Sequence, residues 1–118
     1  ICILGDDPFG RVLDQLVEGE TSNGRKIEVE RIRRPSASRS CQVLFVSTSE
    51  KNVPAMLSAV GSGVLTVSDR EKFLNEGGMI ALFVEGTHVR FDINLRAASK
   101  ASLSLNARLL NVARSVQR

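Results

Sequence analysis

Three aspartates stand where a parallel β-sheet would place polar chemistry, directly after strands that the sequence predicts. Asp6 and Asp7 follow the first apolar run, and Asp69 follows a later one. Carboxylates grouped at strand ends are typical of magnesium-dependent phosphoacceptor sites. That chemistry also needs an aspartate after the middle strand, but residues 46–49 contain no carboxylate, and no lysine follows Met79–Glu85. We therefore interpret Asp7 as a helix cap and Asp69 as part of a helical first turn.

Other kinds of chemistry also lack a necessary residue. The single histidine, His88, falls in a predicted hairpin turn, and no Gly-x-Ser-x-Gly elbow or lysine-bearing phosphate loop is present. Two cysteines and one histidine are too few for a four-ligand zinc site. We predict no catalytic residue, no metal site and no cofactor, so the sequence indicates a binding domain and not an enzyme.

Charge and composition exclude two further classes. The net charge is only +3, the basic residues are scattered apart from Arg31, Arg33 and Arg34, and Trp and Tyr are absent. Nucleic-acid binding usually shows a denser basic face with aromatic residues, so we expect none here. The three arginines fit a solvated edge strand, where charge discourages pairing with other chains. No apolar run approaches the ~18 residues of a membrane span.

The elements that must position these residues follow from apolar periodicity. The predicted strands are Ile1–Leu4, Lys26–Ile32, Gln42–Val46, Val64–Val67, Met79–Glu85 and Thr87–Asn94. The predicted helices begin near Phe9, at Pro54, at the capping-box sequence Ser68–Glu71, at Leu95, and before Leu109 near the end of the chain. In the last helix, the residues expected to face inward are Leu109, Leu110, Val112, Ala113 and Val116.

Alternating strands and helices predict an α/β fold. We expect three layers: a mainly parallel mixed sheet with helices on both faces and an antiparallel hairpin at one edge. Residues 1–118 are expected to form a single domain. Because the chain opens without Met, directly on a strand, we expect an N-terminal portion to have been lost, so the missing export signal says nothing about the compartment.

The two cysteines, Cys2 and Cys41, allow two interpretations. They are either buried thiols on core strands or a disulfide that joins neighbouring strands. The residues alone favour neither, because geometry and redox compartment decide between them.

Several segments in order resemble the YfiR-like family. They are Ile1–Gly10, Asn23–Ile27, Cys41–Ser47, Val64–Asp69, Gly77–Ile80 and Val89–Leu95 with Ala97 and Ala98, leading into Leu103–Leu110. Each motif is weak alone, but the series spans nearly the whole chain. Members of this family resemble one another in having an export signal and an apolar, aromatic-containing helical segment ahead of the first strand. Both are absent from this sequence.

The resemblance implies a function and a compartment. The best-known relatives are periplasmic inhibitors of an inner-membrane diguanylate cyclase, held off by an outer-membrane lipoprotein. By that resemblance the chain is a periplasmic regulator that binds and inhibits a diguanylate cyclase or a sensor kinase. It would lower cyclic-di-GMP signalling and biofilm formation, with the lipoprotein as a second partner.

The resemblance also implies that Cys2 and Cys41 form a disulfide, which an oxidising periplasm would preserve. A second cysteine pair of some relatives has no counterpart, because Glu76 and Phe83 occupy the matching region.

Two other functions compete with the regulatory one. A small-molecule sensor would use a pocket at the strand ends near Gly5–Asp7, Ser47–Ser49 and Ser68, and a degenerate phosphoacceptor would react with acetyl phosphate. A regulator should contact its partner through apolar surface left uncovered, for which Leu103 and Leu105 are candidates, although both could instead be core residues. The edge strand and the terminal helices also offer surfaces for a homodimer.

Overall fold

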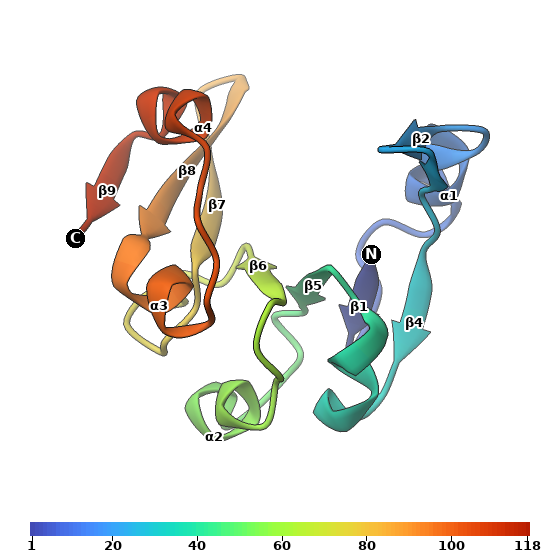
Figure 1. Cartoon of the computed structure of the whole chain (residues 1–118), viewed down its shortest axis with the longest axis horizontal. Coiled ribbons are helices and arrows are strands. Elements are labelled where there is room, and N and C mark those ends of the chain that lie inside the picture. Colours follow the sequence, from blue (N-terminus) through green and yellow to red (C-terminus); the bar gives the residue numbers. More distant parts are fainter.

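The computed structural model describes residues 1–118, except for the side chain of Arg39, and contains a seven-stranded sheet in the order β4-β1-β5-β6-β7-β8-β9 (Figure 1). Its strands are β1 (Cys2–Leu4), β4 (Glu30–Ile32), β5 (Val43–Val46), β6 (Leu65–Ser68), β7 (Ile80–Glu85), β8 (His88–Asn94) and β9 (Ser115–Gln117). A separate ribbon pairs β2 (Thr21–Ser22) with β3 (Arg25–Lys26). The helices are α1 (Arg11–Val17), the 3-10 helix η1 (Pro35–Ser40), α2 (Val53–Ser58), α3 (Leu95–Lys100) and α4 (Ala107–Val112).

Strand pairing confirms the predicted fold class. The pairs from β4 through β7 are all parallel, β7 and β8 form the antiparallel hairpin, and β9 pairs in parallel with β8. The central strands are short apolar runs because both of their faces are covered or half-covered. The predicted charged edge is also confirmed, since β4 is an outer strand of the large sheet.

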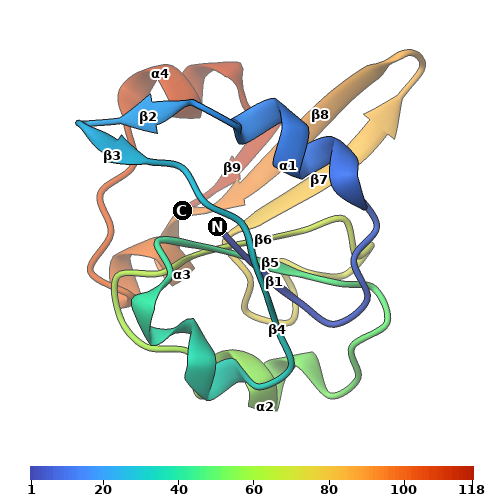
Figure 2. The same ribbon diagram turned by 90° about the vertical axis from the view of Figure 1, so that its right-hand side faces the viewer.

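One side of the sheet carries the larger core. Leu4, Leu44 and Val46 project from the central strands onto Val53 of α2 and onto Phe73, which is fully buried. The helices α2 and η1 cover this side, whereas α1 and α4 lie on the opposite side, over the two ends of the sheet (Figures 1 and 2). A second cluster around Ile80 and Ile93 lies beneath α3, α4 and the segment that links them.

The segment after Ser68 is not the predicted helix. The Ser68 hydroxyl does accept a hydrogen bond from the Arg70 amide, as a cap would, but residues 71–77 form successive turns. The Gly78 amide bonds the Phe73 carbonyl and closes the last turn. A regular helix is overridden because this short connection must bury Phe73 and return the chain to the neighbouring parallel strand. The prediction that Asp69 lies in a helical first turn is therefore wrong.

The end of the chain also differs from the prediction. The helix α4 ends at Val112, which is 64% exposed and does not face inward. Val116 is half-buried as predicted, but it lies on β9, opposite Ile93. The otherwise unpaired edge of β8 explains the change, because an open strand edge offers hydrogen-bonding groups that an extended chain can satisfy.

The first helix is shorter and more exposed than its apolar periodicity predicts. The helix α1 begins at Arg11, so Asp7 caps only the turn before it, where its carboxylate accepts a hydrogen bond from the Phe9 amide at 2.8 Å. No residue of α1 is buried, and Val12 and Leu16 are 61% and 70% exposed. The predicted strand Lys26–Ile32 is divided between β3 and β4.

Candidate partner-binding surface

The polar groups at the carboxyl ends of the central strands are bonded to one another. The Ser49 hydroxyl accepts a hydrogen bond from the Asp6 amide and donates to the Ser47 hydroxyl, both at 3.0 Å. Gly5, with φ of +93°, lies so close that a side chain there would meet Ser49 and Ser47 at 2.9 and 3.0 Å. The polar groups where a small-molecule pocket was predicted therefore bond in part to one another, and the pocket itself stays a prediction.

Arg70 closes the neighbouring part of the same edge. Its guanidinium donates to the carbonyls of Thr48 and Glu50 at 3.2 and 2.7 Å and to both carboxylate oxygens of Glu76 at 3.0 Å. Hydrogen bonding to Glu76 raises the pKa of Arg70 above its ordinary value. The arginine thus ties the β5 loop to the turns before β7.

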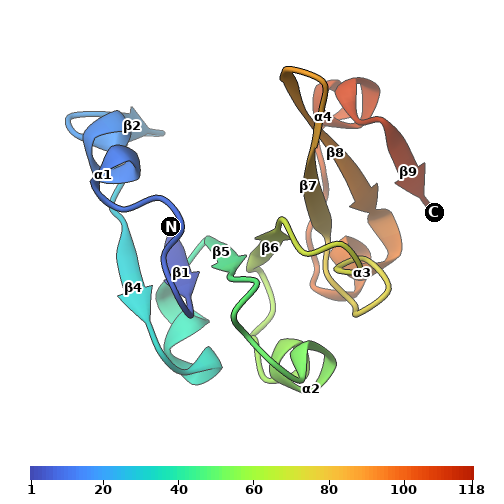
Figure 3. The ribbon, with the colours of Figure 1, turned by 180° about the vertical axis from the view of Figure 1, so that it is seen from behind.

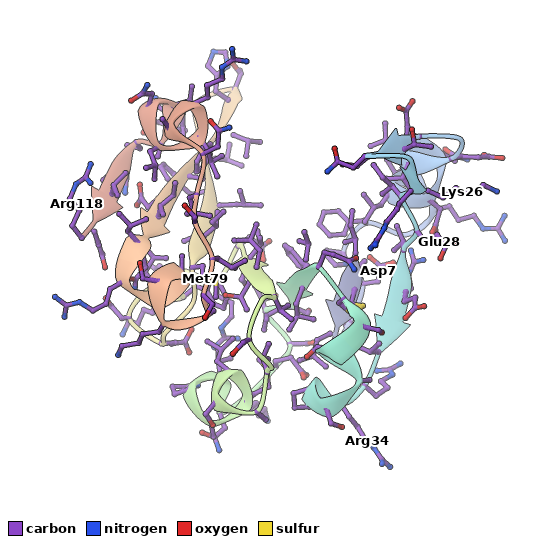
Figure 4. All side chains as sticks on the ribbon, viewed as in Figure 1. Asp7, Lys26, Glu28, Arg34, Met79 and Arg118 are labelled. Carbon is purple, nitrogen blue, oxygen red and sulfur yellow. A yellow bond between two sulfur atoms is a disulfide. The ribbon has the colours of Figure 1, made fainter. Side chains whose placement is uncertain are left out.

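A second arginine fastens α1 to the edge of the sheet. Arg31 on β4 donates to Asp7 at 2.7 and 2.9 Å and to Asp14 of α1 at 2.8 and 2.9 Å. The Phe9 amide and Arg31 lower the pKa of Asp7, and Arg31 lowers the pKa of Asp14. Figure 4 shows Asp7 on the same arm of the molecule as β4 and α1. These bonds hold α1 and the turn before it against β4.

The other polar residues considered from the sequence do not lie together in one site. Asp69 and His88 are both exposed, and His88 lies at the tip of the hairpin. Among the residues that the structure describes, no three His, Cys, Asp or Glu side chains could share a metal ion. In the same residues, no helix is long and apolar enough to cross a bilayer.

The side of the sheet that carries α1 and α4 presents a continuous apolar row. Successive cross-strand partners from β1 to β9 are Ile3, Phe45, Val67, Ile80, Ile93 and Val116. The ends of this row are covered, at one end by Phe9, whose ring lies 4.9 Å from that of Phe45, and at the other by the leucines around α4. In the described part of the chain, no helix or strand lies over β5 and β6 on this side (Figures 1 and 3).

What we call the open apolar face consists of Val43, Leu65, Val67, Leu82, Val84 and Val89, of which Leu65, Val67 and Leu82 also pack against the cluster of Ile80 and Ile93. Four of them are half-buried, whereas Val84 and Val89 are 73% and 67% exposed and lie directly opposite each other near the hairpin tip. Adjacent exposed apolar side chains, continuous with a half-buried apolar row, are candidates for an interaction surface. The open apolar face is thus the strongest candidate for contact with another protein segment.

Leu103 and Leu105, the residues predicted to contact a partner, are half-buried and pack against the cluster of Ile80 and Ile93. They also line a shallow surface groove together with Leu95 and Leu110. Neither observation tests partner binding, so the role of Leu103 and Leu105 as contact residues stays a prediction.

Sequence reasoning missed the pair Val84 and Val89. The alternation of Val89, Phe91 and Ile93 did indicate one apolar face of that strand. The sequence offered no signal that this face would lack a covering helix, because that depends on where α1 and α4 pack.

The disulfide between Cys2 and Cys41 is present. The two Cα atoms lie 5.9 Å apart, within the usual range for a disulfide, and both residues are buried. The bond ties β1 to the residue that follows η1.

These features define a class: a small three-layer α/β domain with a buried disulfide, internally paired polar strand ends and an exposed apolar face. A family model described as YfiR/HmsC-like matches residues 1–114 of the 118-residue chain, so the chain belongs to the YfiR/HmsC-like family.

Proposed function

We propose that the chain is a periplasmic regulatory domain that binds and inhibits a membrane-anchored signalling protein, in the first place a diguanylate cyclase. The observation that carries this proposal is the family match over residues 1–114, since YfiR/HmsC-like proteins are known as periplasmic regulators of diguanylate cyclases. The disulfide supports an oxidising compartment, because the cytosol keeps most thiols reduced. The chain would act by binding, with no cyclic-di-GMP chemistry of its own.

The contact surface in this proposal is the open apolar face, and its occupant is an apolar segment of the partner's periplasmic region. Val84 and Val89 offer exposed methyl groups side by side, and the row of half-buried residues behind them extends the apolar contact. Burying such side chains is favourable by about 25 cal/mol per Å² of apolar surface, which makes them suitable anchors.

The test measures binding of the purified chain to the periplasmic region of a membrane cyclase whose gene lies beside its own. The double variant Val84→Thr/Val89→Thr keeps β-branched side chains in the strands but makes the surface polar, so binding should weaken at least tenfold. The control is Glu85→Gln/His88→Gln, the adjacent cross-strand pair, whose side chains point to the opposite face of the hairpin. Equal binding by wild type and both variants would show that the open apolar face is not the contact.

The apolar helical segment that the resemblance implies ahead of the first strand could compete for the same face. A longer chain carrying that segment should then bind the cyclase less tightly than residues 1–118 do. If the longer chain binds equally well and Val84→Thr/Val89→Thr changes only its thermal stability, the face belongs to the segment and the contact lies elsewhere.

Leu103 and Leu105 are the second proposed contact. Leu103→Ala and Leu105→Ala should weaken binding at temperatures where circular dichroism shows the variants to be fully folded. If they lower only the melting temperature, both leucines are core residues. The same binding experiments, repeated with an outer-membrane lipoprotein, test the proposed second partner. Light scattering of the chain alone measures its mass and tests the proposed homodimer.

A further inference from the structure

A groove of about 510 Å³ lies between α2 and α3, on the side of the sheet opposite the open apolar face. Its apolar lining comes from both helices, from the residues just after them, and from the residues that precede β6 and β7: Leu57, Val60, Val64, Met79, Ala97 and Ala101. Figure 4 shows Met79 in the part of the molecule that contains β7, β8 and α3. The volume falls within the range of small-molecule sites, roughly 300–1,000 Å³.

Positive charges predominate along this groove. Arg96 and Lys100 both line it, one helical turn apart on α3. Among the described side chains neither cation forms an ion pair. The one acid in the lining, Glu76, is already held by both nitrogens of the Arg70 fork at 3.0 Å. The groove therefore carries an excess of positive charge above an apolar floor.

This arrangement works against α3 itself. Like charges spaced at i and i+4 repel and destabilise a helix, by an amount similar to what an opposite pair contributes. An anionic group placed between Arg96 and Lys100 would relieve that repulsion and gain charge-assisted hydrogen bonds from both. The hydroxyl of Ser62, which also lines the groove, lies on the opposite, α2 side and can add a further polar contact.

We propose that the groove between α2 and α3 binds a small molecule with an apolar body and one anionic group, of the carboxylate class. The apolar body lies against Leu57, Val60 and Met79, and the carboxylate lies between Arg96 and Lys100. This site is separate from the partner-binding surface of the proposed function, so either can fail without the other.

The test uses octanoate as the probe and octanamide as its uncharged counterpart, with the full chain and no partner present. Calorimetric titration and thermal unfolding should show saturable binding of octanoate and at least tenfold weaker binding of octanamide. Arg96→Gln/Lys100→Gln should weaken octanoate binding at least tenfold, whereas Arg108→Gln, a matched exposed arginine outside the groove, should leave it unchanged.

Amide chemical shifts in ¹⁵N spectra locate the binding independently of any variant. Octanoate should move the resonances of Leu57, Val60 and Ala97 more than those of the hairpin. No saturable binding of octanoate, equal binding of octanamide, or the same affinity in Arg96→Gln/Lys100→Gln would each overturn the proposal.

Discussion

Removal of the disulfide between Cys2 and Cys41 should strongly destabilise this domain. The two cysteines are separated by 39 positions. In the chain-entropy model, closing a loop of about 40 residues lowers the entropy of the unfolded chain and so raises the free energy of unfolding by roughly 4 kcal/mol. A domain of this kind has a net free energy of unfolding of only about 5–15 kcal/mol. The bond therefore represents a large share of the total stability.

The variant Cys2→Ala/Cys41→Ala tests this magnitude. With an unfolding entropy of about 2.1 cal/mol/K per residue, a loss of 4 kcal/mol over 118 residues lowers the melting temperature by about 15 °C. Calorimetry should show that drop for the variant and a similar one for reduced wild type, while the reductant should not affect the variant. A drop below about 5 °C, or an equal effect of reductant on the variant, would refute the reasoning.

Two further regions give measurable expectations. In Gly78→Ala the new methyl group would overlap the ring of Phe73, which is fully buried. Chemical denaturation should therefore show a free energy of unfolding about 1–3 kcal/mol lower than that of wild type. The control is Gly61→Ala, whose methyl group would have no neighbour within 4 Å, and its free energy of unfolding should stay within about 0.5 kcal/mol of wild type. Arg31→Gln should release α1, which hydrogen exchange would detect as faster exchange of its amides, and the more exposed Arg33 gives a matched control in Arg33→Gln.

The stabilisation that Arg31 provides should also depend on pH. Because Asp7 and Asp14 have pKa values lowered below 3.8 in the folded chain, their contribution is fully present above the ordinary carboxylate range. It is lost as the pH falls through the lowered values. Unfolding of wild type and Arg31→Gln should therefore differ near neutral pH and converge in strong acid, and a difference that grows on acidification would contradict this account.

The parallel core strands were predictable because burial on both faces requires short apolar runs. The runs that became β1, β5 and β6 carry that signal directly. The two segments whose type of secondary structure was wrong have another origin. Residues 69–78 and Ser115–Gln117 take their form from tertiary partners, namely the site that buries Phe73 and the open edge of β8, and local patterns do not encode those partners.

The candidate surface was harder to predict than the fold. Periodicity correctly marked Val12 and Leu16 as one apolar stripe, yet it could not show that this stripe would face solvent. The exposed pair Val84 and Val89 depends on the hairpin extending past its neighbours, which only the assembled sheet determines. The disulfide could be chosen only from the family resemblance, since the residues alone allowed free thiols equally well.

The regulation that we propose requires this YfiR/HmsC-like chain to bind the periplasmic region of a membrane protein. The most direct measurement is a titration of the purified chain into a membrane preparation of the neighbouring cyclase, with cyclic-di-GMP synthesis as the readout. We predict a saturable fall in synthesis that Val84→Thr/Val89→Thr shifts to at least tenfold higher concentration. Unchanged synthesis at saturating wild-type chain, with no detectable binding, would contradict the account.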